Sequence, residues 1–464
     1  MRIRTTLAIM AMLGVAAPAL AESAPHVERA PELPSVWHRE NLPTAAATAG
    51  SPTEWTTYAA HPGRNAVFPG GGAHRWRFAG AGALPLNGPP LNGDVRTTAY
   101  TVGMPVGVSL AGGVAYVGSD NGYAYAMNAR TGKPVWARPL WNMAMSNPLV
   151  AEGLVFYATG NPYFNGANTA KVARGERAVR GPGLNGIYAL DARTGEERWR
   201  FLTAGQNMPT PVLVDDLLIF SNGDGHAYAL DARTGALRWK QDVVSINGMS
   251  SLAAGEGLVY FGGSRPGKFY ALEARTGRVA WTWSDRALSA NGMGDATPAY
   301  AEGIVVESTV LATGQPETPV VGAVLALEAK SGRELWRRTF SSGRLKPGMS
   351  TGTPVVHGGR VYVSSPIDGR LRALDLRTGA VTWQTELAGL GPAGGAVAEG
   401  RLYLPHADGR VSVLDQADGR VLTSFRVGGR FGPTSPVIWG RTIYLANMYG
   451  WVTADPLPAL EPRR

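Results

Sequence analysis

A series of near-identical segments constrains the fold of this chain more than any other feature. The best-preserved copies read Ala-Leu-Asp-Ala-Arg-Thr-Gly, with a tryptophan four residues after the glycine. Six copies end in this tryptophan and a seventh, at Gly419, has Thr423 in its place; the six are Trp136, Trp199, Trp239, Trp281, Trp336 and Trp383. Successive glycines lie 40 to 63 residues apart. That spacing is typical of four-stranded propeller blades with occasional insertions.

Each cassette predicts a strand, a tight turn and a second strand. In the copy at 188–199, alternation of Tyr188 and Leu190 indicates a half-buried strand, and Asp191 can accept hydrogen bonds from the turn amides. Gly195 supplies the positive φ that closes the hairpin. The indole of Trp199 combines a large apolar area with one donor, so we expect it to pack between neighbouring blades.

A second repeated element predicts the inner strand of each blade. It begins with a methionine, small residues and a proline, and its eight copies start at Met104, Met145, Met208, Met249, Met293, Met349 and, in degenerate form, Leu390 and Gly432. Eight inner strands and seven cassettes leave one blade without an outer strand, which residues 74–78 can supply. The sequence therefore predicts an all-β fold: one eight-bladed β-propeller of four-stranded antiparallel blades over residues 53–456, closed by an N-terminal strand that joins the C-terminal blade.

The segments outside the repeats have a different character. Arg2 and Arg4 precede an apolar run that ends in Ala19-Leu20-Ala21, so residues 1–21 are predicted to be a signal peptide cleaved near Ala21. Residues 22–52, rich in Ala, Pro and Glu, are expected to be a flexible leader, and residues 457–464 a C-terminal tail. After cleavage, the mature chain is expected to be periplasmic or otherwise exported, and soluble, with no transmembrane segment.

Net charge and cysteine content limit the ligands and catalytic groups that the chain can use. The net charge is +9, although only 17% of residues are charged, which favours an anionic small molecule, a negative surface or an acidic medium. No basic run or reader motif indicates nucleic acid. The chain has no cysteine, which excludes thiolate catalysis and a lipid anchor on cysteine. Its seven histidines lack the paired spacing of zinc sites, so no metal site is predicted.

The Asp-x-x-Thr-Gly-x-x-x-Trp cassette resembles the repeat of the pyrroloquinoline-quinone (PQQ) type propellers over nearly all of the predicted mature chain. Resemblance to the quinoprotein dehydrogenases of this group implies PQQ and calcium, but those enzymes commonly carry an adjacent-cysteine disulfide and are longer. Resemblance to the scaffold lipoprotein of outer-membrane β-barrel assembly implies a binding role with outer-membrane assembly proteins as partners. That scaffold is tethered through a lipidated cysteine, which this chain lacks.

Three stretches look like the tetrathionate hydrolases of sulfur-oxidising bacteria, exported propeller enzymes that work in acid. They are residues 55–68, 204–211 (Ala-Gly-Gln-Asn-Met-Pro-Thr-Pro) and 291–298 (Asn-Gly-Met-Gly-Asp-Ala-Thr-Pro). This resemblance implies hydrolysis of a sulfur–sulfur bond in a polythionate dianion, with no cofactor expected. Whether the chain is an enzyme or a binding scaffold stays open at this point.

Laying the repeats in register identifies a candidate acid. The loops before the inner strands are expected to meet at one mouth of the ring, and Asp295 is the sole carboxylate among their equivalent positions. Asp295 either assists a water molecule in catalysis or caps its own turn; the resemblance implies the catalytic role. Glu307 ends the predicted strand 304–307, where other blades have Gly262, Ser221, Ser364 or Ser119, so it is either a helper carboxylate or a structural ion-pair partner.

Candidate substrate-binding residues surround the same mouth. A dianion with sulfonates at both ends needs separated cations and neutral donors. The candidates are Arg96, Asn207, Asn247, Asn291, Arg344, Lys346 and His406, each of which is alternatively a solvated loop residue. The six methionines of the inner-strand element are interpreted as packing residues.

An insertion at residues 162–185 lengthens one blade and contains Lys171, Arg174, Arg177 and Arg180. It is compatible with a lid, an oligomer contact or a tolerated surface excursion, and the sequence leaves homo-oligomerisation open.

Overall fold

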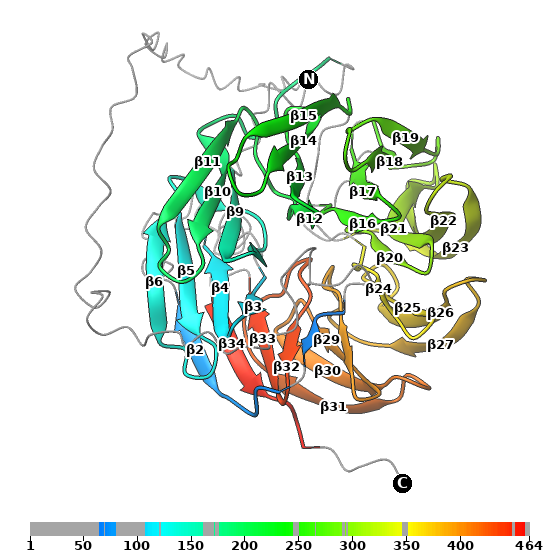
Figure 1. Ribbon diagram of the computed structural model, residues 1–464. Helices are drawn as coiled ribbons and strands as arrows, with labels where there is room; N and C mark the ends of the chain where they lie inside the picture. Colours follow the sequence, from blue (N-terminus) through cyan, green and yellow to red (C-terminus); the bar gives the residue numbers. More distant parts are fainter. Residues whose placement is uncertain are drawn as a thin grey trace, which may run out of the picture.

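The computed structural model describes residues 65–68, 70–79, 107–119, 122–160, 171, 176–244, 250–264, 266–289, 293, 296–345, 351–447 and 451–459. Within these ranges the regular elements are strands, which form eight sheets arranged as a ring (Figure 1). The predicted eight-bladed β-propeller is confirmed. Over the same residues, no helix has the length and apolar character needed to span a bilayer.

The first four blades follow one another in chain order. Blade 1 contains β3 (Ser109–Ala111), β4 (Val114–Gly118), β5 (Tyr123–Asn128) and β6 (Pro134–Pro139). Blade 2 contains β7 (Met143–Ala144), β8 (Leu149–Ala151), β9 (Leu154–Gly160), β10 (Asn185–Asp191) and β11 (Glu197–Thr203). Blade 3 contains β12 (Val212–Val214), β13 (Leu217–Ser221), β14 (His226–Asp231) and β15 (Leu237–Asp242). Blade 4 contains β16 (Ala253–Gly255), β17 (Leu258–Gly263), β18 (Lys268–Glu273) and β19 (Val279–Trp283).

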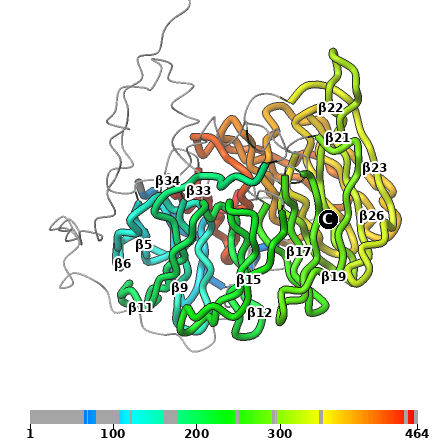
Figure 2. The backbone as a smooth tube through the Cα atoms, turned by 90° about the horizontal axis from the view of Figure 1, so that it is seen from above, coloured from blue at the N-terminus to red at the C-terminus, as the bar shows by residue number. Residues whose placement is uncertain are grey.

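The remaining four blades complete the ring. Blade 5 contains β20 (Ala299–Ala301), β21 (Ile304–Ala312), β22 (Val320–Glu328) and β23 (Glu334–Gly343). Blade 6 contains β24 (Val355–His357), β25 (Arg360–Ser365), β26 (Arg370–Asp375) and β27 (Val381–Glu386). Blade 7 contains β28 (Ala396–Ala398), β29 (Arg401–Pro405), β30 (Arg410–Asp415) and β31 (Val421–Arg426). Blade 8 contains β32 (Val437–Trp439), β33 (Thr442–Ala446), β34 (Trp451–Pro456) and two N-terminal strands, β1 (Val67–Phe68) and β2 (Trp76–Ala79). The strands of blade 5 are the longest, and their hairpin rises above the neighbouring blades in Figure 2.

The cassette tryptophans lie between blades, as the repeat predicts. The indole Nε1 of Trp136 donates to the Ala192 carbonyl of the next blade at 2.9 Å. Its ring covers Gly195, where an added Cβ would lie 2.6 Å from the indole. Gly195 has a φ of 70°. The same pairing of indole, carbonyl and glycine recurs for Trp199, Trp239, Trp281, Trp336 and Trp383. Glycine is therefore required both by the turn and by the tryptophan above it.

The third strand of a blade is more buried than alternation predicts. Tyr188 and Leu190 were expected on a half-buried strand, but residues 185–190 of β10 are all buried. A middle strand is covered on both faces because a blade stacks against a neighbour on each side. Alternating exposure appears instead on the outermost strand, β11.

The ring is closed by the predicted outer strand. Strand β2 pairs antiparallel with β34, and Trp76 lies opposite Ala454. Trp76 also donates to Ala129 of blade 1 at 2.8 Å and covers Gly132, so it acts as the missing cassette tryptophan. The two ends of the chain are thereby joined within one blade.

A second closure element was not predicted. Strand β1 pairs parallel with β32 and brings Val67 opposite Ile438 on the inner side of blade 8. The Asn65 side chain accepts from the Val397 amide at 2.6 Å and donates to the Val397 carbonyl at 2.8 Å. This two-point contact fastens the N-terminal segment to blade 7 as well as to blade 8.

Candidate functional site

The candidate site residues belong to one end of the propeller, where the loops between blades and one set of hairpin turns lie. Strands alternate in direction within an antiparallel blade, so the loops between an outer and the next inner strand lie at the same end as the turns between second and third strands. We call this end the loop face. Asp295, Arg96, Asn247, Asn291 and Lys346 belong to such loops in the sequence but lie outside the described residues, so their predicted roles stay predictions.

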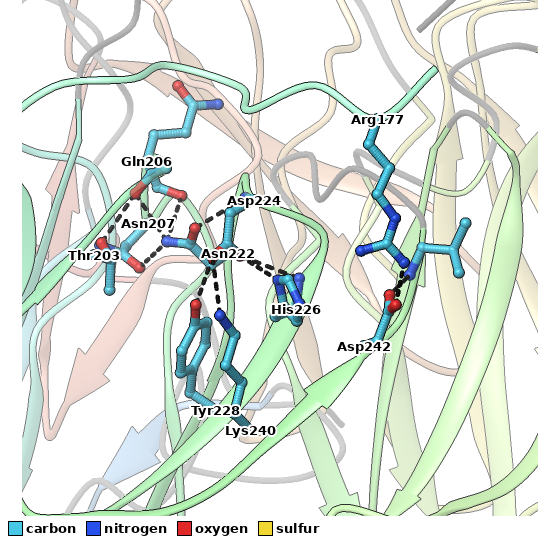
Figure 3. Close-up of polar contacts among 12 residues, drawn as sticks. Arg177, Thr203, Gln206, Asn207, Asn222, Asp224, His226, Tyr228, Lys240 and Asp242 are labelled. Atoms are coloured by element: carbon cyan, nitrogen blue, oxygen red, sulfur yellow. Dashed lines mark hydrogen bonds and ion pairs between the residues drawn. The ribbon is translucent and has the colours of Figure 1, made fainter. Parts of the chain in front are cut away.

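Asn207 lies in a buried network on the loop face (Figure 3). Its amide nitrogen donates to the Thr159 carbonyl at 3.1 Å and to Thr203 Oγ1 at 2.8 Å. Its Oδ1 accepts from Asn222 at 2.7 Å. Both amide hydrogens are used by protein acceptors, so Asn207 orders the loop between blades 2 and 3 in this structure. Direct donation to a substrate would require one of these bonds to break.

A cluster of charged and polar groups adjoins this network and was missed by the sequence analysis (Figure 3). The Asp224 carboxylate accepts from the Tyr228 hydroxyl, lies 3.3 Å from His226 Nδ1 and lies 3.9 Å from Lys240 Nζ. Burial, and then the bond to Asp224, raise the pKa of the Tyr228 hydroxyl. Part of the signal was present, because His226 and Tyr228 are spaced two apart in β14, which places their side chains on one face of the strand, and Asp224 lies in the turn just before it.

The basic insertion packs on blade 3. The backbone of Arg180 accepts from the Gln206 amide at 3.0 Å and donates to the Gly223 carbonyl at 2.7 Å. Arg177 pairs with Asp242, which is the last residue of β15 (Figure 3). The described part of the insertion is therefore attached to the neighbouring blade by its backbone and by one ion pair.

This ion pair predicts a pH-dependent attachment. The bond from Arg177 lowers the pKa of Asp242 below its ordinary value of 3.8, against the effect of partial burial. A lowered folded pKa stabilises the attachment above pH 3.8 and loses that effect as the pH falls through the folded value. At pH 5 we expect Asp242→Asn to speed amide exchange of residues 176–182 roughly five-fold, because an exposed pair contributes up to about 1 kcal/mol.

The difference between Asp242→Asn and the parent chain should shrink as the pH falls through the lowered folded pKa of Asp242. Asp215→Asn, which removes an exposed pair with Arg275, is the matched control and should leave this segment unchanged. Equal exchange of residues 176–182 in parent and Asp242→Asn at pH 5 would contradict the attachment.

His406 is fully buried on the loop face. Its Nδ1 lies 2.9 Å from the Ala388 carbonyl, which can only accept, so Nδ1 carries the hydrogen. Its Nε2 is buried without a hydrogen-bond partner among the described residues. Burial lowers the pKa of His406, Arg410 lowers it further, and the bond to Ala388 opposes both. A neutral imidazole presents a lone pair rather than a cation, so His406 can hold a sulfonate only after it takes up a proton.

Removing this buried imidazole should change how stability depends on pH. As the pH falls below 6.5, the unfolded chain binds a proton that the folded imidazole resists, so His406 destabilises the fold progressively. Asparagine is the residue at this register in blades 3 and 8, so His406→Asn should fold. We expect the urea midpoint of His406→Asn to fall less between pH 7 and pH 5 than that of the parent. If the urea midpoints of the parent and His406→Asn fall by the same amount between pH 7 and pH 5, the buried imidazole is not the cause of the pH dependence.

Arg344 lies away from the inner strands. It follows the outermost strand of blade 5, β23, and its guanidinium donates to the Pro316 carbonyl at 2.6 Å. It also lies 3.6 Å from Glu317, and its side chain is 64% exposed. The described contacts thus tie Arg344 to the blade 5 hairpin.

Glu307 occupies an unexpected register. The strand pairs Ala299 with Val306 in blade 5 and Ala253 with Tyr260 in blade 4, so Glu307 corresponds to Phe261. The sequence alignment of Glu307 with Gly262 and Ser221 is wrong by one residue, because the strand end gave no marker of pairing. Ser308 is the residue at that position. Glu307 is buried with 0% exposure where the other seven blades carry buried apolar or aromatic residues, which are Val117, Tyr157, Phe220, Phe261, Val363, Leu404 and Leu445.

The described methionines of the inner-strand element are packing residues, as interpreted. Met145, Met208 and Met293 are all buried. Met293 lies so close to β17 that a side chain on Gly262 would collide with the Met293 carbonyl. The loop that carries the predicted acid is therefore anchored at Met293 against blade 4.

Comparison with known proteins places the chain in a family. The family model described as outer membrane protein assembly factor BamB matches residues 65–174, 183–366 and 283–455. A tetrathionate hydrolase of Acidithiobacillus ferrooxidans is 33% identical over 452 residues, covering 92% of this chain and 90% of the relative. The chain belongs to this repeat family and, within it, to the tetrathionate hydrolase family. The tetrathionate hydrolase of Acidianus ambivalens is 30% identical over 83% of this chain and 78% of the relative.

A solved structure of another protein shares the fold of this chain. A europium-containing methanol dehydrogenase matches with a TM-score of 0.59 and 14% identity, over 84% of this chain and 89% of that one. At this identity the likeness concerns the fold alone.

The described residues contain no group of three or more His, Asp or Glu side chains arranged for a metal ion. The chain also lacks the cysteines for an adjacent-cysteine disulfide. The expectation that the chain needs no cofactor stays a prediction.

Proposed function

We propose that this chain is a hydrolase that cleaves a sulfur–sulfur bond of a small polythionate dianion, with tetrathionate as the first substrate to test. The observation that carries this proposal is 33% identity to a tetrathionate hydrolase across nearly the whole of both chains. The net charge of +9 supports it, since a positive protein attracts a dianion.

In the proposed reaction, water forms a bond to one sulfur of the sulfur–sulfur bond, and the bonding electron pair leaves with the other sulfur. One proton of the water must be accepted as the new sulfur–oxygen bond forms. We assign this step to Asp295, with loop-face cations and donors holding the sulfonates. No electron donor or acceptor is needed, and no persulfide forms on the protein, because the chain has no cysteine.

The three stretches that resemble the hydrolases divide into structural and chemical parts. Asn65 closes the ring and Asn207 orders a loop, so residues 65–68 and 204–211 support the site rather than supply its acid. The stretch 291–298 contains the carboxylate that the reaction requires.

A scaffold in outer-membrane protein assembly is the second candidate, because the matching family model carries that description. The test is to incubate the purified chain at pH 3 with tetrathionate and follow substrate loss and thiosulfate formation. A parallel sample receives PQQ, calcium and an alcohol, and a third is examined for co-purifying outer-membrane barrel proteins. Tetrathionate loss without additives supports the hydrolase; its absence at every pH, together with barrel proteins in the third sample, supports the scaffold.

A further inference from the structure

Ion pairs join neighbouring blades at the end of the propeller opposite the loop face. We call this end the turn face; it contains the first hairpin turn of each blade and the cassette turn between the third and fourth strands. In blades 2 to 5 the first hairpin turn opens with an acid, and its carboxylate pairs with a cation in the cassette turn of the next blade. The four pairs are Glu152–Arg233 at 2.8 Å, Asp215–Arg275 at 3.0 Å, Glu256–Lys330 at 3.1 Å and Glu302–Arg377 at 2.5 Å.

These four acids occupy a backbone conformation that favours glycine. Their φ angles lie between 48° and 57°, a region that only glycine adopts without steric cost. The same turn position is glycine in blade 6, as Gly358, and there the cation of the next blade is absent too, because Ala417 stands at the register of Arg377. The strained acid is therefore found where a cassette cation pairs with it, and both are absent together at blade 6.

On both sides of blade 1 the cation is present and the acid is not. Arg193 of blade 2 has the cassette register of Arg233, but the matching turn position in blade 1 is Gly112. Arg130 of blade 1 has the same register, and the matching position in blade 8 is Gly440. Both arginine side chains are exposed, and neither pairs with a carboxylate among the described residues. Two cations thus lack the acid that holds their counterparts in blades 3 to 6.

A third cation of blade 1 lacks its acid inside the cassette turn. In blades 4 and 5 the cassette opens with a glutamate that pairs with an arginine five positions later, as Glu273 does with Arg278. In blade 1 these positions are Asn128 and Lys133. Asn128 Oδ1 accepts from two amides of its turn, each at 3.0 Å, so it stabilises the turn without carrying a charge. The described residues of blade 1, 107–119 and 122–139, contain no acid.

The three unpaired cations lie on adjoining turns. Within blade 1 the Ala129 amide donates to the Gly113 carbonyl at 2.9 Å, which joins the cassette turn to the first hairpin turn. Across the boundary, Trp136 of blade 1 donates to the Ala192 carbonyl at 2.9 Å, so the turn that carries the third cation lies against blade 1. A Cβ added to Gly112 would meet nothing within 4 Å. We define the blade 1 cation patch as Arg130, Lys133 and Arg193.

We propose that the blade 1 cation patch docks an acidic segment of a partner protein, whose carboxylates take the places of the three absent acids. Charge complementarity carries this assignment, because cations of the same registers elsewhere on the turn face hold carboxylates. An anionic membrane suits the patch less well, because none of the large apolar side chains exposed among the described residues lies on the turn face of blade 1 to enter a bilayer. The proposal does not depend on hydrolysis at the loop face.

Two triple variants with the same change in net charge test this surface. One removes the unpaired cations of the patch, and the other removes two arginines and a lysine that already hold carboxylates. The patch variant is Arg130→Gln/Lys133→Gln/Arg193→Gln, and the control variant is Arg233→Gln/Arg275→Gln/Lys330→Gln. The probe is a fluorescent oligoglutamate peptide, titrated at neutral pH and low ionic strength. We expect the Kd of the patch variant to rise about ten-fold or more above the parent value, and that of the control variant to stay within about two-fold.

Filling the vacant acid position is the second test. Gly112→Glu places a carboxylate where blade 2 has Glu152, and the φ of 55° at Gly112 is close to the 48° of that glutamate. The new carboxylate then competes for Arg193, so we expect oligoglutamate to bind about five-fold more weakly, the upper size of one exposed pair. Gly112→Gln has the same length without the charge and should bind as the parent does.

The two tests have outcomes that decide against the patch. Equal loss of oligoglutamate binding in both triple variants would assign the binding to net charge alone and overturn the proposal. The same holds if Gly112→Glu and Gly112→Gln bind alike. Absence of binding to the parent, or binding of the parent to phosphatidylglycerol vesicles but not to oligoglutamate, would overturn an acidic protein segment as the occupant.

Discussion

Replacing Asp295 by asparagine is expected to lower kcat for tetrathionate by a factor of about 100 to 10,000, while the chain still folds. The amide has nearly the same shape as the carboxylate but cannot accept the proton of the attacking water, and general base catalysis contributes a factor of this size. The measurement is initial rate against tetrathionate concentration at several pH values, with the melting temperature recorded in the same buffers.

The control for this substitution is Asp418→Asn. Asp418 accepts from the Arg420 amide in a turn at the opposite end of the propeller, so its loss should leave kcat unchanged. If Asp295 only caps its own turn, Asp295→Asn will lower the melting temperature and leave kcat near the parent value. That pattern would remove Asp295 from the mechanism without removing the hydrolase.

Removing the N-terminal strands is expected to abolish cooperative folding. A chain that begins at residue 80 lacks β1 and β2, so blade 8 loses its outer strand and blade 1 loses the covering indole of Trp76. The exposed strand edge of β34 then becomes a site for aggregation. Trp76→Ala alone should cost about 3 to 5 kcal/mol, as for other buried tryptophans.

Thermal melting and size-exclusion chromatography test this closure. A chain that begins at residue 53 keeps both strands and serves as the control. If the chain from residue 80 melts at the same temperature as this control and stays monomeric, the ring does not depend on its N-terminal strands.

The fold was predictable because one contact, a tryptophan packed on a glycine of the next blade, is repeated around the ring. Trp136 and Gly195 meet across a blade boundary, and the same pair recurs in register along the sequence. The missing cassette in blade 8 then identified the strand that contains Trp76. Strand β1 was not predictable, because two residues in parallel pairing leave no alternating pattern.

The site was harder to predict because its contacts depend on strand register. Aligning the predicted strand ends placed Glu307 with Gly262, whereas pairing places it with Phe261. The Asp224 cluster joins residues from a turn and two strands, and only the pairing of β14 with β15 brings Lys240 near Asp224. The burial of His406 Nε2 without a hydrogen-bond partner among the described residues was also not predictable, because no local sequence motif indicates it.

The most direct test of the central proposal is hydrolysis of tetrathionate in ¹⁸O-labelled water by the purified chain, without thiol, quinone or metal added. If water cleaves the sulfur–sulfur bond, mass spectrometry will find one ¹⁸O per turnover in a sulfur–oxygen product, at a rate that depends on Asp295. Loss of tetrathionate without ¹⁸O in any product, or no loss of tetrathionate at any pH, would contradict it.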